Sequence, residues 1–195
     1  MDEKYGVCIA DPAWQYQQFS AAKHGAASSA YECMSTQDIC DIPVDDWMAK
    51  DSVLLLWATW PKLMDAFEVG TSWGFDYITA FPWIKTSPNT GNIKLGIGFW
   101  TQGVSEVVMV WKKGKSKAKK SAANVAGLLT GDERQFYAPS SKHSKKPMDL
   151  HQYAENRLPG PYLELFARRQ MPGWTCWGGD LGYFLDKDGV HKIDG

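Results

Sequence analysis

Short apolar runs divide the chain into strand-like and helix-like segments. The run at residues 5–10 has the length of a buried strand, and the continuous run at 53–57 is typical of a parallel strand buried on both faces. Four later segments also have strand character: 77–84, 104–111, 162–166 and 174–177. Pro82 interrupts the first of these four, which predicts a bulge or an edge position there.

Helical segments lie between these runs. Ser35 and Asp38 are typical of a helix start, Pro43 limits that helix to a turn or two, and a second short helix is expected at 45–49. Pro61 suits the first turn of a helix that carries Leu63, Met64 and Phe67 at helical spacing and ends at Gly70 or Gly74. Pro147 opens a last helix with Leu150, Tyr153, Ala154 and Leu158 on one side. Strands that alternate with helices predict an α/β fold with a largely parallel sheet and right-handed crossovers.

Composition and length fit one soluble domain. The chain has 195 residues, of which 44% are hydrophobic and 22% charged, and residues 1–195 show no internal repeat and no second domain. Neither a transmembrane run nor the basic and apolar start of a signal peptide is present. Four cysteines without Cys-x-x-Cys spacing predict reduced thiols, and four scattered histidines predict no metal site. Ten tryptophans are more than a core needs and leave flat surfaces for stacking on bases.

Charge is spread unevenly along the chain. The net charge is −1, but residues 112–147 contain ten Lys or Arg and two acids, which gives +8 and leaves −9 for the rest. A basic segment on a neutral protein indicates a polyanion at one face, and its alternative is a solvated, lysine-rich loop. We therefore expect a flexible basic insertion around 112–140, with Lys112, Lys113 and Lys115 among its nucleic-acid contacts.

The first strand ends at the most informative stretch, Asp11-Pro12-Ala13-Trp14. Pro12 cannot donate to a sheet ladder, so the chain leaves the sheet there, at the strand end where α/β sheets bind ligands. The stretch places a carboxylate, a carbonyl and an indole together. The alternative interpretation is a strand-ending turn with a solvated Asp11 and a core Trp14. A low-complexity stretch at 20–30 follows and predicts a mobile lid beside the site.

The chain resembles the adenine-N6 methyltransferases typified by the catalytic subunit of the eukaryotic messenger-RNA N6-adenosine methyltransferase. The resemblance covers residues 9–181 and rests on the joint order of short motifs. The motifs are Ala10-Asp11-Pro12-Ala13-Trp14, Tyr31-Glu32-Cys33-Met34-Ser35, Leu55-Leu56-Trp57-Ala58-Thr59, Trp73-Gly74-Phe75, Trp83-Ile84-Lys85-Thr86, Gly98-Phe99-Trp100 with Glu106, His143-Ser144-Lys145-Lys146-Pro147, Glu164-Leu165-Phe166-Ala167-Arg168, and Gly173-Trp174 before Trp177-Gly178. Ala13 stands where the family usually has a second proline, which keeps the main-chain carbonyl but loosens the turn.

This resemblance implies a Rossmann-like fold that binds S-adenosylmethionine, in a permuted order with the catalytic strand first and the cofactor strand late. The implied catalytic residues are Asp11, Pro12, Ala13 and Trp14. The implied cofactor residues are Asp11, Lys146, Glu164, Leu165, Arg168, Gly179 and Asp180, of which Gly179 has only its backbone to offer. The implied substrate residues are Trp14, Tyr31 and Glu106. For Tyr31 a core position is the alternative, for Glu106 an edge-strand charge, and for Lys146 one more lysine of the basic segment.

The expected chemistry needs neither a nucleophilic side chain nor a metal. The lone pair of an exocyclic amine is delocalised into the adenine ring, and two fixed acceptors can turn it toward the methyl group. The Asp11 carboxylate and the Pro12 carbonyl are such acceptors, while Trp14 would stack on the adenine. A base in a duplex must first be flipped out.

Several functions fit this resemblance. The favoured one is methylation of adenine N6 in DNA, as in the small bacterial and bacteriophage members of the family, which implies a cytoplasmic protein of a bacterial cell or infected host. RNA is the nearest alternative substrate, a catalytically silent nucleic-acid-binding subunit is another, and the basic segment disfavours a small-molecule methyltransferase. No target-recognition domain is evident, so target choice would come from the loops at 87–98 and 112–120 or from a partner subunit or second copy.

Overall fold

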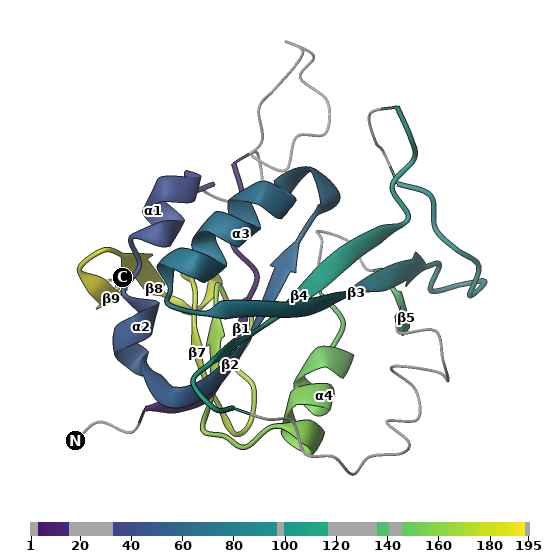
Figure 1. Ribbon diagram of the computed structural model, residues 1–195. Coiled ribbons are helices and arrows are strands. Elements are labelled where there is room, and N and C mark those ends of the chain that lie inside the picture. The colour runs from purple at the N-terminus through teal and green to yellow at the C-terminus, as the bar shows by residue number, and fades with distance from the viewer. Residues whose placement is uncertain (1–3, 16–32, 97–99, 117–135, 141–145, 194–195) are drawn as a thin grey trace.

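A seven-stranded sheet forms the centre of the computed structural model, which describes residues 4–15, 33–96, 100–116, 136–140 and 146–193 (Figure 1). The strands lie in the order β5-β3-β4-β2-β1-β6-β7. Their bounds are β1 Tyr5–Ala10, β2 Met48–Ala58, β3 Asp76–Thr86, β4 Ser105–Lys113, β5 Phe136–Pro139, β6 Tyr162–Leu165 and β7 Trp174–Trp177. All neighbours are parallel except β4, which is antiparallel to both β2 and β3. The expected α/β fold with a mostly parallel sheet is confirmed, as is the early position of the Asp11 strand and the late position of the Glu164 strand.

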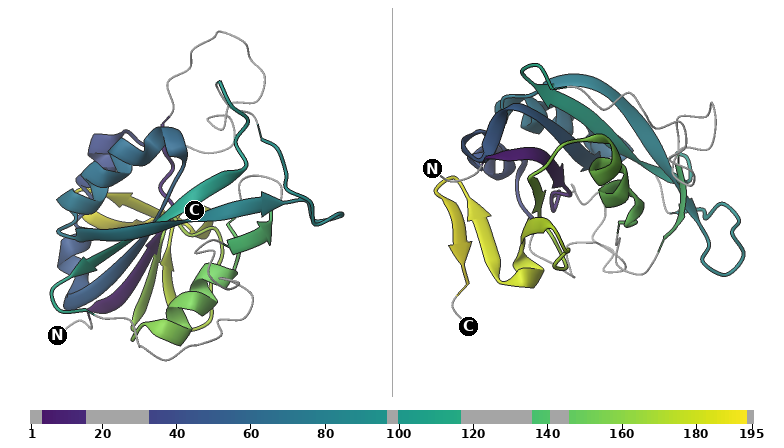
Figure 2. Two further views of the ribbon diagram at one scale, coloured as in Figure 1. Left: turned by 45° about the vertical axis from the view of Figure 1, so that its right-hand side comes forward. Right: turned by 90° about the horizontal axis from the view of Figure 1, so that it is seen from below.

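Helices cover both faces of the sheet (Figures 1 and 2). One face packs against α1 Thr36–Cys40, α2 Val44–Trp47 and α3 Leu63–Ser72, the last preceded by the 3-10 turn η2 Trp60–Lys62. The other face packs against α4 Asp149–Arg157. Alternate residues of β1 enter the two cores, since Cys8 and Ala10 face α1 and α3 whereas Val7 and Ile9 face α4. This alternation is what a strand buried on both faces requires.

The helix ends follow the expected chemistry at both α1 and α3, since α3 stops at Ser72 and Gly74, with φ +79°, follows the capping residue Trp73. Ser35 and Asp38 form a reciprocal capping box at the start of α1, in which the Ser35 hydroxyl accepts from the Asp38 amide. In α3 the buried residues are Ala66, Val69 and Gly70, while Met64 is 78% exposed, so the apolar face predicted from Met64 is wrong. Gly70 lies inside the helix, and the position requires glycine because a β-carbon there would come within 2.6 Å of the Trp111 ring.

Strand β3 differs in detail from its prediction. The register with β4 shifts between Tyr77 and Thr79, so the irregularity lies there and not at Pro82. The parallel neighbour β5 pairs only with the segment from Trp83 onward. Pro82 therefore has β4 as its only neighbour among the described strands, which agrees with the edge alternative.

Some strands are longer than the sequence predicts, and three strands were not predicted. Strand β4 continues through Lys113, so the first two lysines of the basic segment belong to the sheet. Neither β5 nor the two-stranded hairpin of β8 Tyr183–Asp186 and β9 Gly189–Lys192 was expected. The predicted lid at 20–30 and most of the predicted insertion, at 117–135, lie outside the described residues. In the part of the chain that the structure describes, no helix is long and apolar enough to span a membrane.

Candidate active site

The carboxyl ends of the parallel strands create one functional edge. Asp11 directly follows β1, and the register places Ala10 between Leu56 of β2 and Leu165 of β6. Because β4 runs the opposite way, it begins at this same edge, where Glu106 lies opposite Trp83 of β3. Residues from five segments of the chain thus converge around Asp11.

Lys146 connects two acidic side chains at this edge. Its Nζ lies 2.8 Å from Asp11 Oδ1 and 2.9 Å from Asp11 Oδ2, and 3.1 Å from Glu106 Oε2. Lys85, on β3, contacts the other Glu106 oxygen at 2.5 Å. Glu106 is only 5% exposed, so both of its oxygens meet a cation in a largely dry environment. The two lysines and two carboxylates form a charge-balanced network.

Burial and these partners shift the protonation equilibria in different directions. Burial raises the pKa of Asp11 above its usual range, although Lys146 opposes the shift. Burial would also raise the pKa of Glu106, but Lys146 and Lys85 outweigh it and hold that pKa below its usual range. Burial alone would lower the pKa of Lys146, yet Asp11 and Glu106 raise it, so Lys146 stays charged.

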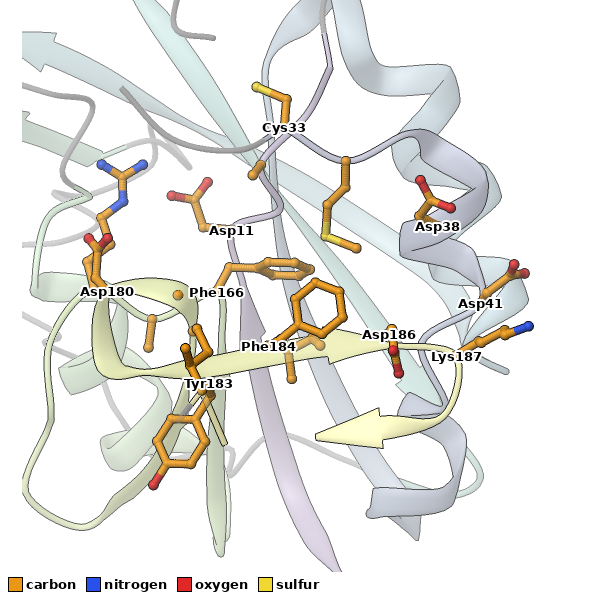
Figure 3. Close-up of a pocket in the computed structure, with 18 residues that line it drawn as sticks. Asp11, Cys33, Asp38, Asp41, Phe166, Asp180, Tyr183, Phe184, Asp186 and Lys187 are labelled. Atoms are coloured by element: carbon orange, nitrogen blue, oxygen red, sulfur yellow. The ribbon is translucent and has the colours of Figure 1, made fainter. Parts of the chain in front are cut away.

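A cavity of about 470 Å³ opens beside Asp11 (Figure 3). Its walls combine the Phe166 and Phe184 rings with polar groups at both ends: Asp180 at one, and Asp38 and Asp41 of α1 at the other. Arg168 also lines the cavity. The hairpin β8–β9 forms a wall that the sequence did not predict, with Tyr183, Asp186 and Lys187 among its contributions. The volume lies within the range of small-molecule and cofactor sites.

Two residues that line the cavity, Phe166 and Gly178, have special backbone requirements. Phe166 has φ +60°, a left-handed conformation that is strained for an aromatic residue and that ends β6 sharply. A β-carbon on Gly178 would lie 2.2 Å from the Ala167 carbonyl oxygen, so only glycine allows the two segments to approach. The Ala167 amide donates to the Trp177 carbonyl at 2.9 Å and fixes this approach.

Most of the predicted cofactor residues come together. Asp11, Ala13, Arg168, Gly179 and Asp180 line the cavity, and Lys146 reaches it through Asp11. Leu165 is fully buried.

Glu164 is held elsewhere. One of its carboxylate oxygens lies 2.8 Å from His151 Nε2 of α4, and the residue does not line the cavity. The structure therefore gives Glu164 a role in joining β6 to α4.

The Asp11-Pro12-Ala13-Trp14 turn is tied down by its own backbone. The Pro12 carbonyl accepts from the Trp14 amide at 2.9 Å, which leaves its second lone pair for another donor. The Ala13 carbonyl accepts from the Met34 amide at 2.9 Å. Trp14 is 5% exposed, and its indole N–H points at the Trp57 carbonyl, 3.4 Å away. Trp14 is thus a core residue here, as the alternative interpretation held, and its stacking on adenine stays a prediction.

The predicted substrate residues lie in different parts of the chain and not all at the Asp11 edge. Glu106 belongs to the charge network, whereas Tyr31 lies outside the described residues. Lys112, Lys113 and Lys115 lie at the far end of β4, and Lys113 is paired with Asp45. Lys112 follows Glu106 by six residue steps along the strand, which is about 20 Å. The structure does not bring these three lysines to the Asp11 edge.

Lys85 is the residue that sequence reasoning missed. It stood inside the Trp83-Ile84-Lys85-Thr86 motif, but nothing in the sequence placed it beside Glu106. Its role depends on the antiparallel pairing of β3 with β4, which no periodicity revealed.

Comparison with known proteins places this site in a family. The MT-A70 family model matches residues 5–180. The Type II methyltransferase M.MunI of a Mycoplasma species is 31% identical over 90% of this chain and 77% of its own length. The human N(6)-adenine-specific methyltransferase METTL4 is 27% identical over 94% of the chain, and the human N(6)-adenosine-methyltransferase catalytic subunit METTL3 is 26% identical over 98%. The chain spans only 39% and 30% of the lengths of these two human relatives. The matched residues 5–180 cover most of the chain and include Asp11, Lys146, Arg168 and Asp180. The chain therefore belongs to the MT-A70 methyltransferase family.

Proposed function

We propose that this chain transfers a methyl group from S-adenosylmethionine to the exocyclic N6 amine of adenine in DNA, on a base flipped out of the duplex. The observation that carries the proposal is the Asp11 carboxylate, which lies at the rim of the cavity and is fixed by Lys146 at 2.8 Å. Relatives named as N6-adenine and N6-adenosine methyltransferases support the choice of adenine.

The cavity fits the methyl donor by the chemistry of its walls. When bound, S-adenosylmethionine supplies a sulfonium methyl group whose leaving group needs no activation. Arg168 would hold an anionic or hydroxyl oxygen, and Asp180 offers an acceptor. Lys146 does not line the cavity and adds its positive charge through the contact with Asp11. The Phe166 and Phe184 rings offer apolar faces for the rest of the molecule.

On the acceptor side, two oxygens of the opening turn would orient the amine. The ionised Asp11 carboxylate and the free lone pair of the Pro12 carbonyl would each accept one N–H of the target amine. These two bonds draw the nitrogen lone pair out of conjugation and toward the cavity. Asp11 must be ionised for this role, and Lys146 favours that state against the effect of burial.

The connection between β3 and β4 is the best-placed described surface for nucleic acid. It leaves and re-enters the sheet at the Asp11 edge, and its exposed side chains include Ile93, Lys94 and Leu95. Trp100, further along the same connection, is fully exposed. A lysine among exposed apolar and aromatic groups suits a phosphate backbone with unstacked bases.

Asp11 variants test the proposal. Asp11→Ala should nearly abolish single-turnover methyl transfer, and Asp11→Asn should cost at least about 2.7 kcal/mol, which is about 100-fold in rate, because one preorganised charged acceptor is lost. Labelled cofactor with mixed DNA and RNA oligonucleotides, followed by nucleoside mass spectrometry, identifies the base and the polymer.

Asp76→Asn is the matched control, because Asp76 is exposed at the start of β3, at the opposite edge of the sheet. Methylated adenine in RNA alone would replace DNA by RNA in the proposal. A folded Asp11→Ala protein with the wild-type rate would exclude Asp11 as the orienting group, and no transfer by the wild-type chain would leave the silent-subunit alternative.

A further inference from the structure

Lys85 is the first member of a chain of ion pairs that ends at Asp11. Its Nζ is 2.5 Å from Glu106 Oε1, the second Glu106 oxygen is 3.1 Å from Lys146, and Lys146 contacts both oxygens of Asp11. Lys85 itself does not line the cavity. The described contacts therefore link Lys85 to Asp11 through Glu106 and Lys146.

The aromatic surroundings hold the two cations in place. Lys85 Nζ lies 5.3 Å from the centre of a Trp83 ring, and Lys146 Nζ lies 5.4 Å from that of Trp57. Both indoles are 1% exposed, so the ring faces that the lysines contact belong to the packed core. The lysines are thus confined by one aromatic contact and one or two carboxylates each.

The charge count shows what Lys85 contributes. With Lys85 present, two cations face two carboxylates, and Lys146 can give two of its three donors to Asp11. Without Lys85, one cation would serve two carboxylates, and the almost fully buried Glu106 would compete with Asp11 for it. An unpaired buried carboxylate also raises the pKa of a neighbouring one.

Other charged groups near the two carboxylates do not replace Lys85. Arg168 acts on Asp11 from the β6 side, and Asp38, Asp41 and Asp180 line the same cavity with the opposite sign. Around Glu106, the described cations in contact are Lys85 and Lys146 alone.

We propose that Lys85 is a positioning residue, which neutralises Glu106 so that Lys146 remains available to keep Asp11 ionised. The inference rests on the proposed function of Asp11 as the acceptor for the target amine. It assigns the acid limit of methyl transfer to a residue that touches neither cofactor nor base.

The test follows Asp11 directly by carbon-13 NMR titration of its carboxyl carbon, identified by the signal missing from Asp11→Asn. Lys85→Gln removes the charge but keeps an N–H donor for Glu106, so the fold is preserved. It should raise the Asp11 midpoint by at least about one pH unit, the lower end of the effect of an unpaired neighbouring charge. The acid limb of the single-turnover rate should move by the same amount.

Two further variants separate charge from shape. Lys85→Arg keeps the cation and should leave the Asp11 midpoint near its wild-type value. The double variant Lys85→Gln/Glu106→Gln removes one charge of each sign and should return the midpoint toward wild type. A midpoint in Lys85→Gln within about 0.2 pH unit of wild type would overturn the proposal, as would a double variant that stays shifted. The titration needs no methyl transfer, so an inactive wild-type chain would refute the proposed function and leave this result standing.

Discussion

Replacing Lys146 tests the energetics of the whole charge network. Lys146→Met keeps the apolar stem and removes the charge, so Glu106 is left with its Lys85 contact and Asp11 with the electrostatic influence of Arg168. The three side chains are largely buried, with exposed fractions of 16% for Lys146, 21% for Asp11 and 7% for Glu106. Breaking a buried ion pair by removing one partner typically costs about 3–5 kcal/mol. We expect a loss of stability in that range at neutral pH.

The pH dependence gives this prediction its sign. The pKa of Lys146 is raised in the folded protein, so its stabilisation is fully present below the pKa of an unfolded lysine and is constant across the acid range. The pKa of Glu106 is lowered, so in the wild type its stabilisation is lost as pH falls through that lowered value. In Lys146→Met the carboxylates instead gain protons more readily in the folded state. The stability difference between the two proteins should therefore shrink steadily as pH falls through the carboxyl range.

Urea unfolding at a series of pH values measures both effects. Lys115→Met is the matched control, because Lys115 is exposed at the far end of β4 and should change stability by no more than about 0.5 kcal/mol. A Lys146→Met difference below about 1 kcal/mol at neutral pH, or one that does not vary with pH, would refute the network as a source of stability.

Two further predictions concern Trp14 and the nucleic-acid contacts. Trp14→Ala should lower the unfolding free energy by about 3–5 kcal/mol in urea titrations, because the indole is 5% exposed within the core, and an unchanged midpoint would contradict that placement. Replacing Lys94 by Ala should reduce the slope of log affinity against log salt by about 0.9 on duplex DNA, if it makes one phosphate contact. The triple replacement of Lys112, Lys113 and Lys115 tests the sequence-based prediction in the same assay, and a larger slope change there than for Lys94 would favour the basic segment.

The parts of the fold that could be predicted are those that depend on local patterns. Continuous apolar runs identified β1 and the buried second half of β2, because a strand buried on both faces must be apolar on both. The first half of β2, from Met48, was missed, and residues 48–49 belong to it and not to the short helix expected at 45–49. The capping chemistry of Ser35 and Asp38 located the start of α1 to the residue. By contrast, β5 has only four residues and buries two of them, which is too short for alternation to be distinctive.

The site could be predicted only where a motif stood for three-dimensional proximity. Asp11 and Lys146 are 135 positions apart, and only the family resemblance brought them together before the structure did. Trp14 shows the limit, since an indole beside a functional carboxylate has the same sequence pattern whether it stacks on a ligand or fills a core. Lys85 shows it again, because its contact with Glu106 depends on the register between two strands.

The antiparallel strand β4 has a consequence for how this scaffold can be re-engineered. Because β3 ends and β4 begins at the Asp11 edge, the ladder between the two strands holds Lys85 near Glu106, and the connection that follows Thr86 adds two backbone bonds to Lys85. The Lys94 amide donates to the Lys85 carbonyl at 2.8 Å, and the Lys85 amide donates to the Val104 carbonyl at 2.9 Å. A change in the length or sequence of this connection should therefore leave the charged pair in place only if it keeps the bonds that Lys94 and Val104 make to Lys85. Under the proposed function, a graft that keeps these two bonds would change the exposed side chains offered to nucleic acid while Lys85, Glu106 and Asp11 keep their positions.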